Sequence, residues 1–185
     1  GKCPGAGEDS VVVGDALDTT SLATALKGCD ALVLLTSAVP KINYTSLIKV
    51  FATKALSYIP FLGIESARPT FTFPDKGTPE EVDWEGAKNQ IDAAVDAGVK
   101  HVVFVGSMGG TQLDNFLNTI GDGNILLWKR KAEKYLVSKE GEVDYTIIHP
   151  GGLLDDEGGK RELVVGVNDT LLDREYRSIP RADVA

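Results

Sequence analysis

Four apolar runs that alternate with helical segments constrain the fold of this 185-residue chain more than any other feature. The runs are residues 11–13 (VVV), 31–37 (ALVLLTS), 101–107 (HVVFVGS) and 144–152 (DYTIIHPGG). The segments between them, residues 18–28, 78–98 and 123–138, have the cap residues and apolar spacing of helices. Strands that are apolar throughout are typical of a parallel sheet covered by helices on both faces. We therefore predict an α/β domain with a doubly wound parallel sheet.

Local signals refine this prediction. In the segment 78–98, Thr78 is the expected cap, Pro79 occupies the first helical position, and Glu81 completes a capping box. The long stretch 38–77 has no strong period, although residues 44–59 could form an amphipathic helix and residues 69–77 a loop or edge hairpin. Near the end of the chain we expect a short strand at residues 161–167 and the start of a helix at 182–185.

Composition excludes several classes of function. The formal charge is −8, whereas binding to nucleic acid needs a basic face. The two cysteines and two histidines show no metal-type spacing, so we expect no metal site and reduced thiols, with a disulfide the minor alternative. No apolar run reaches the length of a membrane span. With 43% hydrophobic and 25% charged residues, the chain has an ordinary soluble globular composition.

Small and polar residues follow the apolar runs, at the edge where parallel α/β sheets bind their ligands. They are Gly14 and Asp15, Thr36 and Ser37, Gly106 and Ser107, and Pro150, Gly151 and Gly152. Each also has a simpler interpretation, as a strand-end hydroxyl, a turn residue or a glycine required by backbone angles. Composition and spacing therefore predict a polar binding rim and go no further.

Four motifs in this order resemble a known family. They are residues 14–38 (GDALDTTSLATALKGCDALVLLTSA), 85–110 (EGAKNQIDAAVDAGVKHVVFVGSMGG), 145–153 (YTIIHPGGL) and 179–185 (IPRADVA). The chain resembles the atypical short-chain dehydrogenase/reductases, and within them the plant and algal NAD(P)-binding proteins related to the chloroplast translocon-associated dehydrogenase. The resemblance covers most of the chain except an insertion at about residues 43–71. It implies that residues 1–185 form a single Rossmann-fold domain that binds NADP or NAD.

The resemblance also implies roles for the rim residues. Asp15 would contact the adenine, and Thr36 and Ser37 would line the ribose side. Gly106 and Ser107 would lie beside the nicotinamide, and Lys129 would hold the nicotinamide ribose hydroxyls. The turn Pro150, Gly151 and Gly152 would shape the nicotinamide pocket. Lys129 lies in the charge-rich run KRKAEK, which by itself is usually a solvated helix face.

Two departures from the family pattern stand out. The first strand and its glycine-rich pyrophosphate turn are absent, and GAGED near the start has no strand before it. Because that strand lies at the centre of such a sheet, we expect this chain to lack an N-terminal strand–helix–strand and a C-terminal part of a larger protein. The second departure is Ile125, four residues before Lys129, where the family's reductases have a proton-donating tyrosine.

Three side chains are candidates to replace that tyrosine. Tyr135 and Trp128 point about 240° and about 100° around the helix from Lys129, so we expect both in packing. His149 ends a strand at the rim, and an imidazole with a pKa near ~6.5 can donate a proton at neutral pH. The simpler alternative is a structural histidine bonded to a loop carbonyl.

Two function hypotheses follow. The first is an NAD(P)H-dependent oxidoreductase of a small carbonyl or quinone-like molecule, with Ser107 orienting the acceptor, Lys129 holding the cofactor, and His149 or water supplying the proton. The second is a non-catalytic NAD(P)-holding subunit of a larger, possibly photosynthetic, assembly. It would dock to another protein or a membrane surface through residues 47–64, for which a lid or a packed surface helix is also consistent. The resemblance implies a chloroplast location, with the cytoplasm as the alternative.

Overall fold

The computed structural model describes residues 11–59, 61, 63 and 65–185. At its centre is a parallel sheet in the order β1-β4-β5, formed by β1 (Ala31–Leu34), β4 (His101–Val105) and β5 (Asp144–Ile148). Leu34 pairs with Phe104, and Phe104 pairs with Ile147, so the carboxyl ends of all three strands lie at one edge. This is the parallel α/β sheet of a Rossmann fold, as the sequence predicts.

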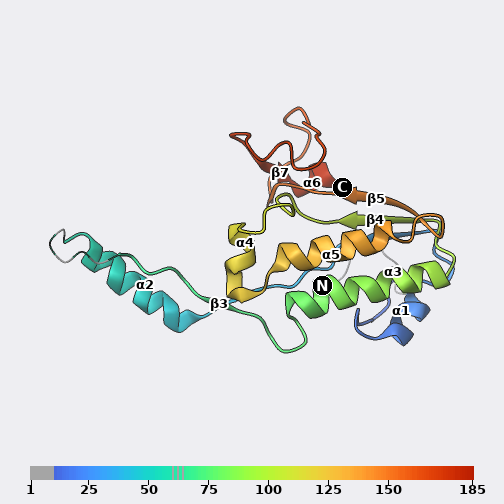
Figure 1. Cartoon of the computed structure of the whole chain (residues 1–185), viewed down its shortest axis with the longest axis horizontal. Helices are drawn as coiled ribbons and strands as arrows, with labels where there is room; N and C mark the ends of the chain where they lie inside the picture. Colours follow the sequence, from blue (N-terminus) through green and yellow to red (C-terminus); the bar gives the residue numbers. More distant parts are fainter. Residues whose placement is uncertain (1–10, 60, 62, 64) are drawn as a thin grey trace.

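Two long helical segments cover one face of this sheet. The first is η3 (Glu80–Gly86), a π-helical stretch that continues as α3 (Ala87–Asp96), and the second is α5 (Ile125–Val137). Both crossovers step the same way across the sheet, so the right-handed rule places both helices on the same side. Figure 1 shows α3 and α5 side by side, with α1 (Thr19–Ala25) next to α3. The core between sheet and helices contains Leu34, Val102, Phe104, Ile91, Ala94, Ala132 and Leu136, all buried.

The opposite face of the sheet is more open. Val33 and Leu35, which alternate with the buried Leu34, are 55% and 68% exposed. The expected covering of the sheet by helices is therefore present on the α3–α5 face of the described structure, whereas these two side chains on the other face are accessible to solvent.

The predicted helix boundaries hold where cap chemistry defines them. The Glu81 carboxylate accepts hydrogen bonds from the Thr78 amide at 3.2 Å and the Thr78 hydroxyl at 2.8 Å, and the Glu81 amide donates to the Thr78 hydroxyl at 3.3 Å, which is the predicted capping box. Asp18 caps α1 by accepting a hydrogen bond from the Thr20 amide at 3.0 Å. Gly98 follows α3 with φ of +73°, a left-handed conformation that glycine adopts without strain.

Two predicted strands are wrong. Residues 11–13 and 161–167 are irregular, and Val13 and Val165 are among their exposed side chains. A strand needs a neighbour for its backbone groups, and neither run has one among the described residues. Instead, β6 (Gly152–Leu154) and β7 (Ser178–Pro180) form a separate two-stranded parallel pair that the sequence did not reveal. The short α6 (Arg181–Val184) follows, close to the helix start predicted there.

The stretch between β1 and η3 forms an arm that projects from the body in Figure 1. Its base is β2 (Lys41–Ile42), paired antiparallel with β3 (Phe71–Thr72), and its length is α2 (Tyr44–Ser57). The helix predicted at residues 44–59 is present, whereas residues 69–77 form a loop with one short strand, β3, whose partner is β2. The remaining elements, α4 (Phe116–Thr119) and η4 (Ile120–Asp122), lead into α5. None of the helices in the described ranges is long and apolar enough to cross a membrane.

Only one of the two cysteines, Cys29, lies within the described residues. Cys29 is a free, partly buried thiol after α1, whose Sγ lies 3.7 Å from the Ala25 carbonyl oxygen. Cys3 lies outside the described residues, as does the GAGED segment.

Candidate active site

The carboxyl edge of the sheet brings together the segments that follow β4 and β5. Beyond the strands, the Gly106 amide donates to the Ile148 carbonyl at 2.9 Å, and the Met108 amide donates to the Pro150 carbonyl at 3.0 Å. These hydrogen bonds hold Ser107 and His149 on adjacent segments at the rim.

Lys129 is buried at this edge, on the first half of α5. Its Nζ lies 2.7 Å from Oδ1 of Asp83 in η3, and the other Asp83 oxygen accepts a hydrogen bond from the Ala38 amide at 3.1 Å. Asp83 therefore joins α5, η3 and the segment after β1. An ammonium has three N–H donors, so this pair leaves others for a ligand. The interpretation of Lys129 as part of a solvated helix face is wrong.

His149 is held by a second buried carboxylate, Glu133, one helical turn after Lys129. His149 Nε2 lies 2.9 Å from Glu133 Oε1, and Arg130 Nη1 donates to Glu133 Oε2 at 2.8 Å. The Glu133 side chain is 3% exposed, whereas that of His149 is 31% exposed. The Glu133 carboxylate beside His149 Nε2 raises the pKa of His149, and this effect exceeds the opposing effect of burial. The charged imidazolium is therefore favoured, at a position that solvent reaches.

Gly106 makes this arrangement possible. A Cβ at residue 106 would overlap the Glu133 carboxylate and approach the His149 ring. Gly151 has a comparable reason, because a Cβ there would overlap the Arg177 carbonyl oxygen. The Gly152 amide donates to that same oxygen at 2.7 Å. Contacts within the protein are therefore sufficient to explain why residues 106 and 151 are glycine.

The loop after β4 is fixed by Asp169, a residue from the last third of the chain. Asp169 accepts hydrogen bonds from the Gly109 amide at 3.0 Å and from the Thr111 hydroxyl at 2.7 Å. Burial alone would raise the pKa of this carboxyl, but the hydrogen bonds outweigh it and the pKa is lowered. The positive charge of His149 acts in the same direction.

The segments that contain the residues expected on the adenosine side contact α3 through Asn89 and Gln90. The Thr36 hydroxyl accepts a hydrogen bond from Gln90 at 3.1 Å, and Ser37 beside it is exposed. Asp15 is exposed, and its Oδ1 accepts from the Leu17 amide at 2.9 Å in a local turn. The next residue, Ala16, accepts a hydrogen bond from Asn89 of α3 at 3.2 Å. The structure thus places Asp15 at α3, apart from the Lys129 and His149 groups.

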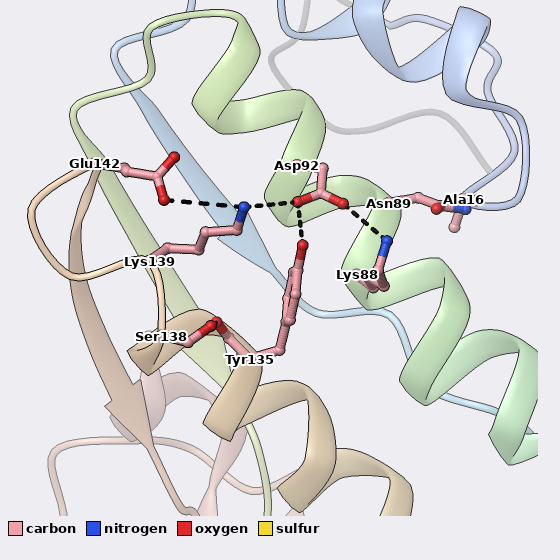
Figure 2. Close-up of polar contacts among 8 residues, drawn as sticks. All are labelled: Ala16, Lys88, Asn89, Asp92, Tyr135, Ser138, Lys139 and Glu142. Atoms are coloured by element: carbon pink, nitrogen blue, oxygen red, sulfur yellow. Dashed lines mark hydrogen bonds and ion pairs between the residues drawn. The ribbon is translucent and has the colours of Figure 1, made fainter.

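Tyr135 is not part of this edge. Figure 2 shows its hydroxyl directed at Asp92 of α3, to which it donates a hydrogen bond. Asp92 also pairs with Lys88 at 3.0 Å and Lys139 at 3.3 Å, and the Tyr135 ring meets Trp84 edge-on at 5.8 Å. Burial, followed by the bond to Asp92, raises the pKa of Tyr135. The predicted packing role of Tyr135 is confirmed.

Trp128, which was also expected to lie outside the site, and His101 have partners of their own. Trp128 is partly buried, with Lys131 Nζ 4.9 Å from its ring centroid. His101 Nε2 lies 3.0 Å from the Thr146 hydroxyl, and His101 is the first residue of β4, at the end of the strand away from the rim. Within the described part of the chain, no three His, Cys, Asp or Glu side chains gather to hold a metal ion.

Sequence reasoning missed three residues of this site. Glu133 had a signal, since it lies four residues after Lys129 and therefore on the same side of α5. Asp83 and Asp169 had none, because their partners are distant in the chain: Asp83 accepts from Ala38, and Asp169 from Gly109. Ile125 begins α5 one turn before Lys129, and its side chain offers no proton.

The rim brings together side chains that can hydrogen-bond a ligand. Ser107 has a partly buried hydroxyl whose one hydrogen bond in the described structure, to the Met108 carbonyl, is long at 3.3 Å. Lys129 has spare donors, and His149 is partly accessible. A parallel α/β sheet with such a rim at its carboxyl edge defines a Rossmann-type dinucleotide-binding domain.

The comparison with known families is specific. A family model described as NAD(P)H-binding matches residues 2–185, and the chain belongs to this family. The resemblance to the atypical short-chain dehydrogenase/reductases is thereby confirmed, as is NAD(P) as the cofactor class.

Two curated relatives are similar over nearly the whole chain. The chain is 53% identical to an uncharacterized chloroplastic protein of Arabidopsis thaliana over 179 residues, which are 97% of this chain and 50% of that protein. It is 46% identical over 184 residues to the sanguinarine reductase of Eschscholzia californica, covering 97% of this chain and 66% of the reductase. The chain thus spans about half to two thirds of the length of these relatives.

Solved structures support the fold. A putative NAD-dependent epimerase/dehydratase from Bacillus halodurans superposes with a TM-score of 0.59 at 22% identity, over 93% of this chain and 61% of that one. At this identity the likeness establishes the Rossmann-type fold and leaves the reaction to be argued from the site.

Proposed function

We propose that this domain belongs to an NAD(P)H-dependent oxidoreductase that reduces a small carbonyl or quinone-like molecule. The observation that carries the proposal is the Glu133–His149 pair, which presents a proton-bearing imidazole at the carboxyl edge where Ile125 cannot supply a proton. Because Glu133 raises the pKa of His149, a larger fraction of the imidazole carries its proton at neutral pH than in an ordinary histidine.

The other residues would bind and orient. Ser107 would direct the acceptor oxygen toward His149, and Lys129, anchored by Asp83, would hold the ribose hydroxyls next to the nicotinamide. Gly106, Pro150, Gly151 and Gly152 would shape the nicotinamide pocket, and Asp15, Thr36 and Ser37 would contact the adenosine half. When bound, NAD(P)H would supply the hydride. The similarity to a reductase supports the reaction class.

The test is a titration of the protein with NADPH and NADH by fluorescence, followed by a search for oxidation with carbonyl and quinone acceptors. We expect binding, oxidation, and a rate at pH 7 that falls about 100-fold or more in His149→Phe, the usual size of a lost general acid. Ser107→Ala should slow the reaction while NADPH binding persists. Full activity in His149→Phe would remove the histidine from the mechanism, and the proton would then come from water.

A second candidate is a non-catalytic NAD(P)-holding subunit. Ile125 in place of the tyrosine favours it, as do the exposed apolar side chains of the arm, through which residues 47–64 would dock (residues 60, 62 and 64 lie outside the described structure). Binding of NADPH without oxidation by any acceptor of a broad set would select this candidate. For either one we propose a plastid location, supported by the chloroplastic Arabidopsis relative, with the cytoplasm as the alternative.

A further inference from the structure

The arm carries a continuous apolar stripe that faces away from the protein. Tyr44, Ile48, Phe51 and Tyr58 are spaced by four, three and seven residues, which places them on one side of α2. Each of these side chains is between 70% and 79% exposed. In the described structure, therefore, the side of α2 that would normally pack against a protein core is turned to solvent.

The opposite side of α2 is already engaged. The Ser46 hydroxyl accepts a hydrogen bond from the Thr70 amide at 3.0 Å, and the Thr53 hydroxyl accepts one from the Ala67 amide at 2.8 Å. The returning segment therefore fixes the rotation of α2 about its axis. Because these bonds hold the polar side inward, the outward direction of the stripe is a property of the fold of the arm.

The charge of the arm differs from that of the rest of the chain. Residues 41–59 include Lys41, Lys49 and Lys54 and no Asp or Glu, in a chain with a formal charge of −8. All three lysines are exposed. Lys54 borders the stripe on one side, and Lys49 lies on the other side of the helix. An anionic surface would attract the arm and repel the remainder of the molecule.

We propose that α2 is a docking helix for an anionic lipid surface, lying in the headgroup region with the stripe of Tyr44, Ile48, Phe51 and Tyr58 inserted. Tyrosines at both ends of the stripe suit the interface, because the ring is apolar and the hydroxyl stays hydrated. Lys54, which borders the stripe, can reach the headgroups while its stem lies along the apolar surface. Fourteen residues rise about 21 Å, which is shorter than a bilayer core, so the helix lies along the surface.

Vesicle flotation of the full chain tests this proposal. The vesicles are made of phosphatidylcholine alone or of phosphatidylcholine mixed with phosphatidylglycerol. We expect binding to the mixed vesicles that weakens with added salt, and little binding to the neutral ones. Phe51→Ser should weaken binding about tenfold, because it removes one large inserted side chain. Lys54→Gln should weaken it about fivefold, the contribution of one lysine near an anionic membrane.

Matched variants on the body separate docking from general effects. Phe116→Ser changes a phenylalanine on α4 that is 59% exposed, against 70% for Phe51, and Lys27→Gln changes an exposed lysine after α1; both variants should bind the mixed vesicles as the wild type does. Phe51→Trp adds a tryptophan to α2, which otherwise has none, and the emission of this tryptophan, taken as the difference from the wild type, should shift to shorter wavelength on mixed vesicles only. Each altered residue is exposed, so folding is expected to persist.

Three results would overturn the proposal. One is no flotation of the wild type on mixed vesicles, and another is equal flotation of Phe51→Ser and Phe116→Ser. The third is a dimer in sedimentation velocity that Phe51→Ser dissociates while lipid has no effect, which would assign the stripe to a second copy of the chain. NADPH oxidation is measured separately, so its outcome bears on the proposed function alone.

Discussion

Helix α5 contributes to two charged clusters that contain similar side chains but lie at different places in the fold. The edge cluster consists of Asp83, Lys129, Arg130, Glu133 and His149, and it meets α5 at residues 129–133, near the end of the helix where the strands end. The clamp cluster, Lys88, Asp92, Tyr135 and Lys139, lies at its second half, next to α3 (Figure 2). The clamp cluster contains a tyrosine and a lysine four residues apart, the spacing of the family's catalytic pair. Spacing alone therefore does not make a site, because the pair must also lie at the carboxyl edge.

The two clusters also differ in burial, and this difference sets their energetic weight. The Asp83 and Glu133 side chains are 0% and 3% exposed, whereas the Asp92 side chain is 34% exposed. A buried charge that loses its partner has no water to replace it, while a partly exposed one does. We therefore expect the edge cluster to be sensitive to every substitution and the clamp cluster to be tolerant.

The largest effect should come from Lys129→Met, which leaves the Asp83 carboxylate buried and unpaired. We expect the free energy of unfolding to fall by about 3–5 kcal/mol, measured by urea denaturation. The matched change in the clamp cluster, Lys88→Met, should cost less than about 1 kcal/mol because its ion pair is partly solvated.

The double variant Asp83→Asn, Lys129→Met sharpens this prediction. With both charges removed, it should be more stable than Lys129→Met alone, since the cost arises from the orphaned carboxylate. Equal losses from Lys129→Met and Lys88→Met would mean that the two clusters do not differ as their burial indicates.

The sequence predicted the elements whose signals are local and missed those that depend on distant partners. The capping box at Thr78 and the glycine at position 98 specify the ends of a helix within a few residues. By contrast, residues 11–13 have the composition of a strand but no neighbour to pair with among the described residues, and β6 and β7 lie 24 residues or more apart. Which strand pairs with which is a long-range property that β propensity does not contain.

The site followed the same division. Ser107 and His149 were predicted at the rim because they end apolar runs, and Lys129 because of the resemblance to the family; in the described structure the three lie at the carboxyl edge. Their partners Asp83 and Glu133 lie in charge-rich helical segments, where a carboxylate usually faces solvent. Only the packing of η3 and α5 against the sheet shows that these two are buried.

The next effect concerns pH. The pKa of His149 in the folded protein is raised above the unfolded value near 6.5, chiefly by Glu133. The pair therefore stabilises the fold fully below pH 6.5, and this contribution is lost as the pH rises through the higher folded-state pKa. We expect the free energy of unfolding of Glu133→Gln to be about 1–3 kcal/mol lower than that of the wild type below pH 6.5. The pH dependence that this pair causes should also disappear in the variant.

Proton NMR measures the same linkage directly, because the chain has only two histidines. The signals of His149 are assigned by comparison with His101→Gln, and their midpoint should move to lower pH in Glu133→Gln. An unchanged midpoint would show that Glu133 does not hold the charged imidazole.

The smallest effect should come from the clamp cluster. Burial tends to raise the pKa of Asp92, but hydrogen bonds from Tyr135, Lys88 and Lys139 outweigh it and lower the pKa below the model-compound value of 3.8. The cluster therefore stabilises the fold above that pH, and the contribution is lost as the pH falls through the folded-state pKa. Tyr135→Phe removes one of these bonds, so it should cost about 1 kcal/mol near neutral pH, and less in strong acid.

Tyr135→Phe also decides whether position along α5 or the spacing of tyrosine and lysine defines the catalytic group. The Tyr135 hydroxyl donates its hydrogen bond to Asp92 in the clamp cluster, and its pKa is raised. Its proton is therefore engaged with Asp92 and is not directed at a substrate at the rim. We expect Tyr135→Phe to oxidise NADPH at the wild-type rate under conditions where His149→Phe does not. The reverse result, loss of turnover in Tyr135→Phe with stability retained, would move the proton donor to the clamp cluster. It would require the substrate to bind on the α3 side of α5, away from the carboxyl edge.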